Sequence, residues 1–285
     1  MDNEWLLTPH TQEHSDKGNK IAKELNLHPV IADLLVLRGI TSTEEAKNFI
    51  APSMGQLYDP FLMDNMQEAV ERLNEALKRR EKILIYGDYD VDGITAVALV
   101  YKCLCRYTAM LDYYIPDRYE EGPGFSFKGA QYAIDNDCLL IIVLDCGVKS
   151  IEQISYAKEQ HIDVIVCDHH RPGDDIPPAI AVLDTKCYES DYPFEHLCGC
   201  GMAFKFMQGF LQYNKLPLST IEDFLDLAAL SIAADNVPLT GENRILAHQG
   251  LQQINHTPCP GIRGILDICG LRNKKIFLLL TSFPR

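Results

Sequence analysis

The stretch Lys82–Val100, KILIYGDYDVDGITAVALV, decides the fold and contains the first candidate functional residues. Its opening apolar run, Ile83–Tyr86, is too short for a helix and rich in residues that favour strands, so it predicts a buried β-strand. The strand ends at Gly87, and three carboxylates then follow at alternate positions: Asp88, Asp90 and Asp92. Like charges held this close repel one another, and burial adds to the cost. We therefore expect a divalent cation beside them.

Apolar strand-like runs and helical segments alternate after this stretch, as is typical of a parallel sheet covered by helices on both faces. The expected strands lie at 110–116, 139–147, 163–170 and 179–184, with helices expected at 128–136 and 150–160. In such folds, ligands bind beyond the carboxyl ends of the strands. Acids or imidazoles stand at two more of these ends, at Asp145 and at Asp168-His169-His170. The sequence thus predicts an α/β fold with one functional edge.

The chain divides into three parts by pattern. Residues 1–62 form a small, mostly helical preface, in which Thr41–Glu45 resembles a capped helix start. Residues 63–240 form the α/β domain, and its last segment, 220–235, is expected to be one long helix that ends at a further acid, Asp235. Residues 241–285 form a helical connector and a β-like tail from Lys274, which we interpret as the first strand of a second domain.

The composition indicates a protein of the reducing cytoplasm. Ten cysteines would suggest disulfides in a small secreted chain, but this chain has 285 residues and opens with a polar segment that lacks an apolar signal core. No apolar stretch is long enough for a membrane span, so no membrane association is expected. Cys198-Gly199-Cys200, with His196 and Cys187 nearby, would make only a weak zinc motif, and buried thiols are the favoured interpretation.

The net charge of −14 is unusual for a protein that binds nucleic acid, because phosphate binding normally leaves a basic footprint. Part of this acid is expected in a metal site. Carboxylates from several strand ends, together with imidazoles, form a mixed oxygen and nitrogen set that suits two ions such as Mn²⁺ or Mg²⁺. Paired ions of this kind support phosphoryl chemistry.

Four segments then match a known family in the expected order and context. GDYDVDGIT, VLDCG, the literal DHH at 168–170 and ALSIAADNVPLTGENR resemble the four motifs of the DHH phosphoesterase superfamily. The flanking segments RGITSTEEAKNFI, YIPDRYEEGPGFS and YPFEHLCGCGMAFKF resemble its RecJ-like branch, the bacterial single-stranded-DNA-specific exonucleases. The resemblance extends from about His28 to Leu271. It identifies residues 63–240 as a DHH phosphoesterase domain.

The resemblance implies a role for each motif residue. The implied metal ligands are Asp90, Asp92, Asp145, His169 and Asp235. The implied catalytic residues are Asp88, Asp168 and His170. Within this set, Asp145 would bridge two ions and Asp168 would orient His169. His170 would face the scissile phosphate or a metal ion.

The resemblance also implies a function. A RecJ-like enzyme uses two Mn²⁺ or Mg²⁺ ions to release nucleotides from the 5′ end of single-stranded DNA, in repair and recombination. Its expected partners are single-stranded DNA and a helicase or single-stranded-DNA-binding protein. RecJ-like proteins continue into a DHHA1 domain and an oligonucleotide-binding fold, whereas this sequence ends at Arg285. A truncated fragment of weak activity is therefore one alternative.

Three other functions stay open. DVDGIT also resembles the nucleophile motif of haloacid-dehalogenase phosphatases, in which an aspartate becomes phosphorylated. Within the DHH group, short oligonucleotides or cyclic dinucleotides are alternative substrates. A non-catalytic nucleic-acid-binding or scaffold protein is the alternative from another class, although such relatives typically lose ligands and none is missing here.

Overall fold

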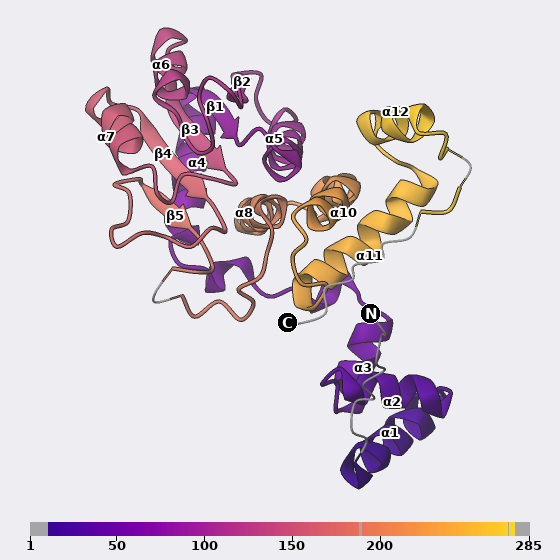
Figure 1. Ribbon diagram of the computed structural model, residues 1–285. Coiled ribbons are helices and arrows are strands. Elements are labelled where there is room, and N and C mark those ends of the chain that lie inside the picture. Colours follow the sequence, from indigo (N-terminus) through magenta and orange to yellow (C-terminus); the bar gives the residue numbers. More distant parts are fainter. Residues whose placement is uncertain (1–10, 188–189, 273, 277–285) are drawn as a thin grey trace, which may run out of the picture. The chain divides into compact units, whose positions relative to one another are not determined.

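The computed structural model describes residues 11–187, 190–272 and 274–276 (Figure 1). The chain separates into two compact units, Met1–Gln56 and Leu57–Arg285. The functional edge lies wholly in the second unit. The three-part division at residues 62 and 240 stays a prediction, because compactness alone does not define domains.

The described part of the first unit is helical. It contains α1 (Gln12–Leu25), α2 (Pro29–Leu37), α3 (Thr43–Ile50) and a short 3₁₀ turn, Met54–Gln56. Apolar side chains of the three α-helices form a core of their own: Ile21, Ala22, Ala32, Leu35, Val36 and Ala46. Ser42 and Glu45 cap α3 reciprocally, as the Thr41–Glu45 pattern predicts. The first unit therefore has a small apolar core made by its own three α-helices.

The second unit is built on a sheet of five parallel strands in the order β2-β1-β3-β4-β5. The strands are β1 (Lys82–Gly87), β2 (Leu111–Tyr114), β3 (Cys138–Leu144), β4 (Asp163–Cys167) and β5 (Ala181–Leu183). Helices α6 (Phe127–Asp135) and α7 (Ile151–Glu159) pack on one face. Helices α4 (Met66–Arg79), α5 (Val91–Leu104) and α8 (Gly199–Tyr213) cover the other, with a 3₁₀ turn at Pro60–Leu62 before α4 (Figure 1). The predicted α/β architecture is confirmed.

The strands are apolar throughout because both faces of the sheet are buried. Leu84 and Tyr86 of β1, with Ile141 and Val143 of β3, point into the core under α6 and α7. The alternate positions, such as Ile85, are equally buried on the opposite face. A period of two is therefore invisible in the sequence, since neither face needs polar residues.

Three longer helices and one short one complete the second unit: α9 (Ser219–Glu222), α10 (Leu225–Ala234), α11 (Gly241–His256) and α12 (Pro260–Ile268). The prediction of a single helix over 220–235 is wrong, because the helical hydrogen bonding is interrupted between α9 and α10. The side chain of Gln253 on α11 inserts at the break. Its amide donates to the Asp223 carbonyl and its oxygen accepts from the Asp226 N–H, so it replaces helical hydrogen bonds.

The β-like tail expected from Lys274 lies largely outside the described residues. No described helix combines the length and the apolar character that a membrane crossing requires.

A buried ion pair joins α8 to α11. Lys205 and Glu242 are both fully buried, with Lys205 Nζ 3.0 Å from Glu242 Oε1. The ammonium also donates to the Tyr58 carbonyl, and the Tyr192 hydroxyl donates to Glu242 Oε2 at 2.7 Å. Burial lowers the pKa of Lys205, because the charged form is desolvated. Each charge is acceptable here only while its partner is present.

We expect Lys205→Met to lower the free energy of unfolding by about 3–5 kcal/mol, because it leaves the Glu242 carboxylate buried without a cation. Urea unfolding followed by circular dichroism measures the loss. The double variant Lys205→Met/Glu242→Leu should recover most of it. The matched control, Lys128→Met, removes an exposed ion pair with Glu120 and should leave stability nearly unchanged. Equal losses in the single and double variants would contradict the assignment.

Candidate metal centre

Four adjacent strands end in register, and an aspartate follows each of them. Gly87 of β1 pairs with Leu144 of β3, Leu144 with Cys167 of β4, and Cys167 with Leu183 of β5. The next residues are Asp88, Asp145, Asp168 and Asp184. The Asp145 N–H donates to the Cys167 carbonyl and the Asp168 N–H to the Leu183 carbonyl, which extends the ladder by one residue. The sheet thus aligns four carboxylates along its carboxyl edge.

Asp145 occupies a strained position at the middle of this edge. Its φ of 59° lies in the left-handed region, which non-glycine residues rarely adopt. Its side chain is buried, and the first residue of α8, Gly199, approaches so closely that a Cβ atom there would overlap with Asp145 Oδ1. Backbone strain of this kind persists where the surroundings hold a functional side chain in place.

Asp90 and Asp92 lie at the start of α5 and have different surroundings. Asp90 is exposed, and its Oδ1 caps the helix by accepting from the Asp92 and Gly93 N–H groups. Asp92 is buried and points toward the N-terminus of α8. There Gly199 N–H donates to Oδ2 and Cys200 N–H to Oδ1, each at 2.7 Å. These two donors hold both oxygens of the Asp92 carboxylate against the first turn of α8.

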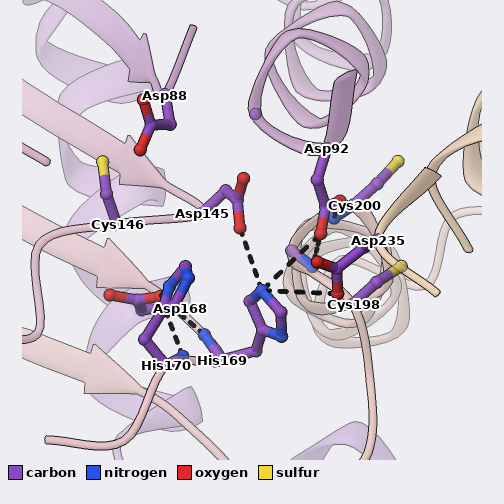
Figure 2. A network of polar contacts seen from close by, with 12 residues as sticks. Asp88, Asp92, Asp145, Cys146, Asp168, His169, His170, Cys198, Cys200 and Asp235 are labelled. Atoms are coloured by element: carbon purple, nitrogen blue, oxygen red, sulfur yellow. Dashed lines mark hydrogen bonds and ion pairs between the residues drawn. The ribbon is translucent and has the colours of Figure 1, made fainter. Parts of the chain in front are cut away.

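His169 lies among three carboxylates (Figure 2). Its Nε2 is 3.1 Å from Asp145 Oδ1, 3.6 Å from Asp92 Oδ2 and 3.9 Å from Asp235 Oδ2. Two groups of possible metal ligands result: Asp92, His169 and Asp235, and Asp145, His169 and His170. In each group the ligand atoms lie within 4.8 Å of one another. Burial lowers the pKa of His169, which favours the neutral imidazole that binds metals.

Asp168 orients His170, whereas the sequence analysis expected it to orient His169. Its Oδ1 lies 2.8 Å from His170 Nδ1, and the same oxygen accepts from the His169 and His170 N–H groups. Oδ2 accepts from the Val148 N–H at 2.9 Å. These interactions keep the pKa of Asp168 below its ordinary value despite burial, and the hydrogen bond to Asp168 raises the pKa of His170. The physical reason is that the turn after β4 brings the ring of the residue two positions ahead, His170, within hydrogen-bond distance of the short Asp168 side chain.

The electrostatics of the cluster fit a divalent cation. Burial, with repulsion from Asp92 and other carboxylates, raises the pKa of Asp145 to about 11, and burial raises that of Asp235 to about 6. Among the described residues, Asp145 Oδ1 and His169 Nδ1 are buried without a hydrogen-bond partner. Carboxylates that neighbouring acids destabilise, beside a neutral imidazole, form a donor set for Mn²⁺ or Mg²⁺.

The thiols near the cluster do not form a zinc site with it. Cys198 and Cys200 are fully buried, and burial raises the pKa of each well above that of a free thiol. Cys198 Sγ accepts from the Gly201 N–H and caps α8. Over the residues described, the possible metal-binding groups contain only aspartate and histidine. The interpretation of these cysteines as buried thiols therefore has the better support.

The structure brings most of the candidate residues together, but not all. Asp88 accepts from the Tyr89 and Gly124 N–H groups, and burial raises its pKa. Neither it nor Asp90 belongs to the two ligand groups in the described part of the chain, so their roles stay predictions.

Asp184 completes the row of aspartates, and it is not among the residues expected from the sequence. This side chain is buried after β5, its Oδ1 accepts from the Lys186 N–H, and its Oδ2 has no partner among the described residues. Burial raises its pKa to about 7. The signal was an aspartate directly after a short apolar run, as at Asp145.

The sequence is similar to those of known exonucleases. The chain is 38% identical over 255 residues to the single-stranded-DNA-specific exonuclease RecJ of Bacillus subtilis, and 34% identical over 270 residues to RecJ of Haemophilus influenzae. These matches cover 90% and 92% of this chain but 32% and 46% of the relatives. The chain thus spans about a third to a half of the length of these relatives.

Solved structures of RecJ proteins are also similar to this chain. RecJ of Thermus thermophilus in complex with Mn²⁺ superposes with a TM-score of 0.75 at 26% identity, over 91% of this chain and 36% of that one. An exonuclease RecJ bound to manganese gives a TM-score of 0.67 at 31% identity, over 75% of this chain and 54% of that one. The family model described as "DHH family, N-terminal domain" matches residues 82–232, which include β1 and most of α10. Since this match covers more than half of the sequence, the chain belongs to the DHH family.

Proposed function

We propose that this chain carries the metal centre of a phosphodiesterase that removes nucleotides from the 5′ end of single-stranded DNA. The observation that carries the proposal is the convergence of Asp92, Asp145 and Asp235 on one His169 nitrogen. The RecJ relatives, named for single-stranded-DNA-specific exonuclease activity, support this substrate class. A role in repair and recombination, and recruitment by a helicase or a single-stranded-DNA-binding protein, follow as parts of the proposal.

Each side chain has a distinct task in this mechanism. Asp92, Asp145, His169 and Asp235 would hold the ions, and Asp90, at the start of α5, would be a further ligand. Two divalent ions would supply an activated water and charge that stabilises the attacking and leaving oxygens. His170 is half exposed beside the cluster, and its Nδ1 is fixed by Asp168. Its other nitrogen is therefore available to a substrate phosphate oxygen or to an ion.

The position of Asp145 makes it the side chain whose charge depends most on the metal. Asp145→Asn removes a carboxyl group whose ionised form is disfavoured by burial and by its neighbours. We expect its melting temperature in EDTA to be no lower than that of the wild type. Adding Mn²⁺ should raise the melting temperature of the wild type, by mass action, and leave that of Asp145→Asn nearly unchanged. Differential scanning calorimetry with and without Mn²⁺ measures both; an equal rise in the two proteins would contradict the assignment.

The same variant tests catalysis. With Mn²⁺, the wild type should release mononucleotides from 5′-labelled single-stranded DNA, and Asp145→Asn should be slower by about 100-fold or more. EDTA should abolish the activity. Asp135→Asn, which changes an exposed acid at the end of α6, is the matched control and should retain the wild-type rate.

Further substrates separate the alternatives. Duplex DNA, 3′-labelled DNA and short oligoribonucleotides are compared in parallel. Cleavage that is independent of metal, or equal in wild type and Asp145→Asn, would refute the proposal. Two bound Mn²⁺ ions by calorimetry without cleavage of any substrate would instead indicate an incomplete enzyme.

A further inference from the structure

Ser231 lies one helical turn before Asp235 on α10, and both side chains approach the metal centre. Ser231 is fully buried, and its Oγ is 2.5 Å from Asp92 Oδ1 and 2.9 Å from Cys198 Sγ. The Asp235 N–H donates to the Ser231 carbonyl, so the two residues belong to one regular turn. A buried hydroxyl in a helix interior usually bonds to its own helix, so this contact across to α5 is informative.

The hydroxyl has one proton and two neighbours of unequal strength. The carboxylate is the better acceptor, and the Oγ–Oδ1 distance is that of a charge-assisted hydrogen bond. The Ser231 hydroxyl therefore donates chiefly to Asp92, and the Cys198 sulfur is the weaker of its two possible acceptors.

The lone pairs of Asp92 can then be counted. Oδ1 accepts from the Cys200 N–H and from the Ser231 hydroxyl, so both of its lone pairs are used. Oδ2 accepts from the Gly199 N–H and keeps one lone pair. This oxygen is the one that lies 3.6 Å from His169 Nε2, on the side of the ligand group.

We propose that Ser231 is a positioning residue, whose hydroxyl fixes the Asp92 carboxylate so that Oδ2 alone is presented to a divalent metal ion. The inference rests on the metal centre of the proposed function. Without the hydroxyl, only the Gly199 and Cys200 N–H groups hold Asp92, one on each oxygen, and Oδ1 regains a lone pair that competes with Oδ2 for the ion. Donors that hold a ligand in this way typically change metal affinity by about 10- to 100-fold.

The test compares Ser231→Ala with the wild type by calorimetric titration of the metal-free protein with Mn²⁺. We expect the dissociation constant to rise by about 10-fold in Ser231→Ala. Alanine is compatible with a helix and adds no volume, so the variant should fold, which circular dichroism in EDTA checks. A global loss of stability does not alter the affinity of molecules that stay folded at 25 °C, so this readout separates positioning from a structural role.

Ser155→Ala is the matched control, because within the described residues the Ser155 hydroxyl donates to the Ile151 carbonyl of its own helix, α7. Its affinity for Mn²⁺ should equal that of the wild type. A rise of less than about threefold in Ser231→Ala, with Mn²⁺ binding intact in the wild type, would overturn the role of Ser231 and leave the proposed function standing. A wild type that binds no Mn²⁺ would overturn both.

Discussion

The repulsion between buried carboxylates at one edge of the sheet is the constraint on which the rest of the second unit depends. A parallel sheet aligns its strand ends, so aspartates that are far apart in the chain are forced into one row. Such a row is unfavourable in water-free surroundings unless each charge is compensated. N–H groups compensate Asp88 and Asp168, whereas the buried Asp145 Oδ1 has no hydrogen-bond partner among the described residues.

The helices that flank the edge supply the compensation. The N-terminus of α8 faces Asp92 with two N–H donors, and Gly199 lets this helix end pack against Asp145 because it has no side chain. Helix α10 contributes Ser231 and Asp235 from successive turns, and α11 holds α10 in place through Gln253. The buried Lys205–Glu242 pair joins α8 to α11. The packing of these helices therefore fixes the geometry of the candidate metal centre.

Asp168 shows why a motif does not by itself assign roles. The sequence places it beside two histidines, and either ring is a reasonable partner. In the structure its carboxylate accepts hydrogen bonds from three backbone N–H groups. The imidazole nitrogen that lies within hydrogen-bond distance of it belongs to His170. His169 is directed instead toward the carboxylates from β3, α5 and α10. The turn after β4 thus directs the two imidazoles toward different carboxylates.

The sequence by itself determined the α/β architecture and the aspartates and histidines that stand at the strand ends, because apolar runs bounded by aspartates are local features that survive in any context. Only the tertiary structure decided the break before α10, the partner of Asp168, the exposure of Asp90 and the burial of Asp184. The break before α10 depends on Gln253, which is far away in the sequence and reaches Asp226, and the pairing of Asp168 with His170 depends on how the turn after β4 folds. Contacts of this kind depend on how the elements pack, and no local pattern encodes them.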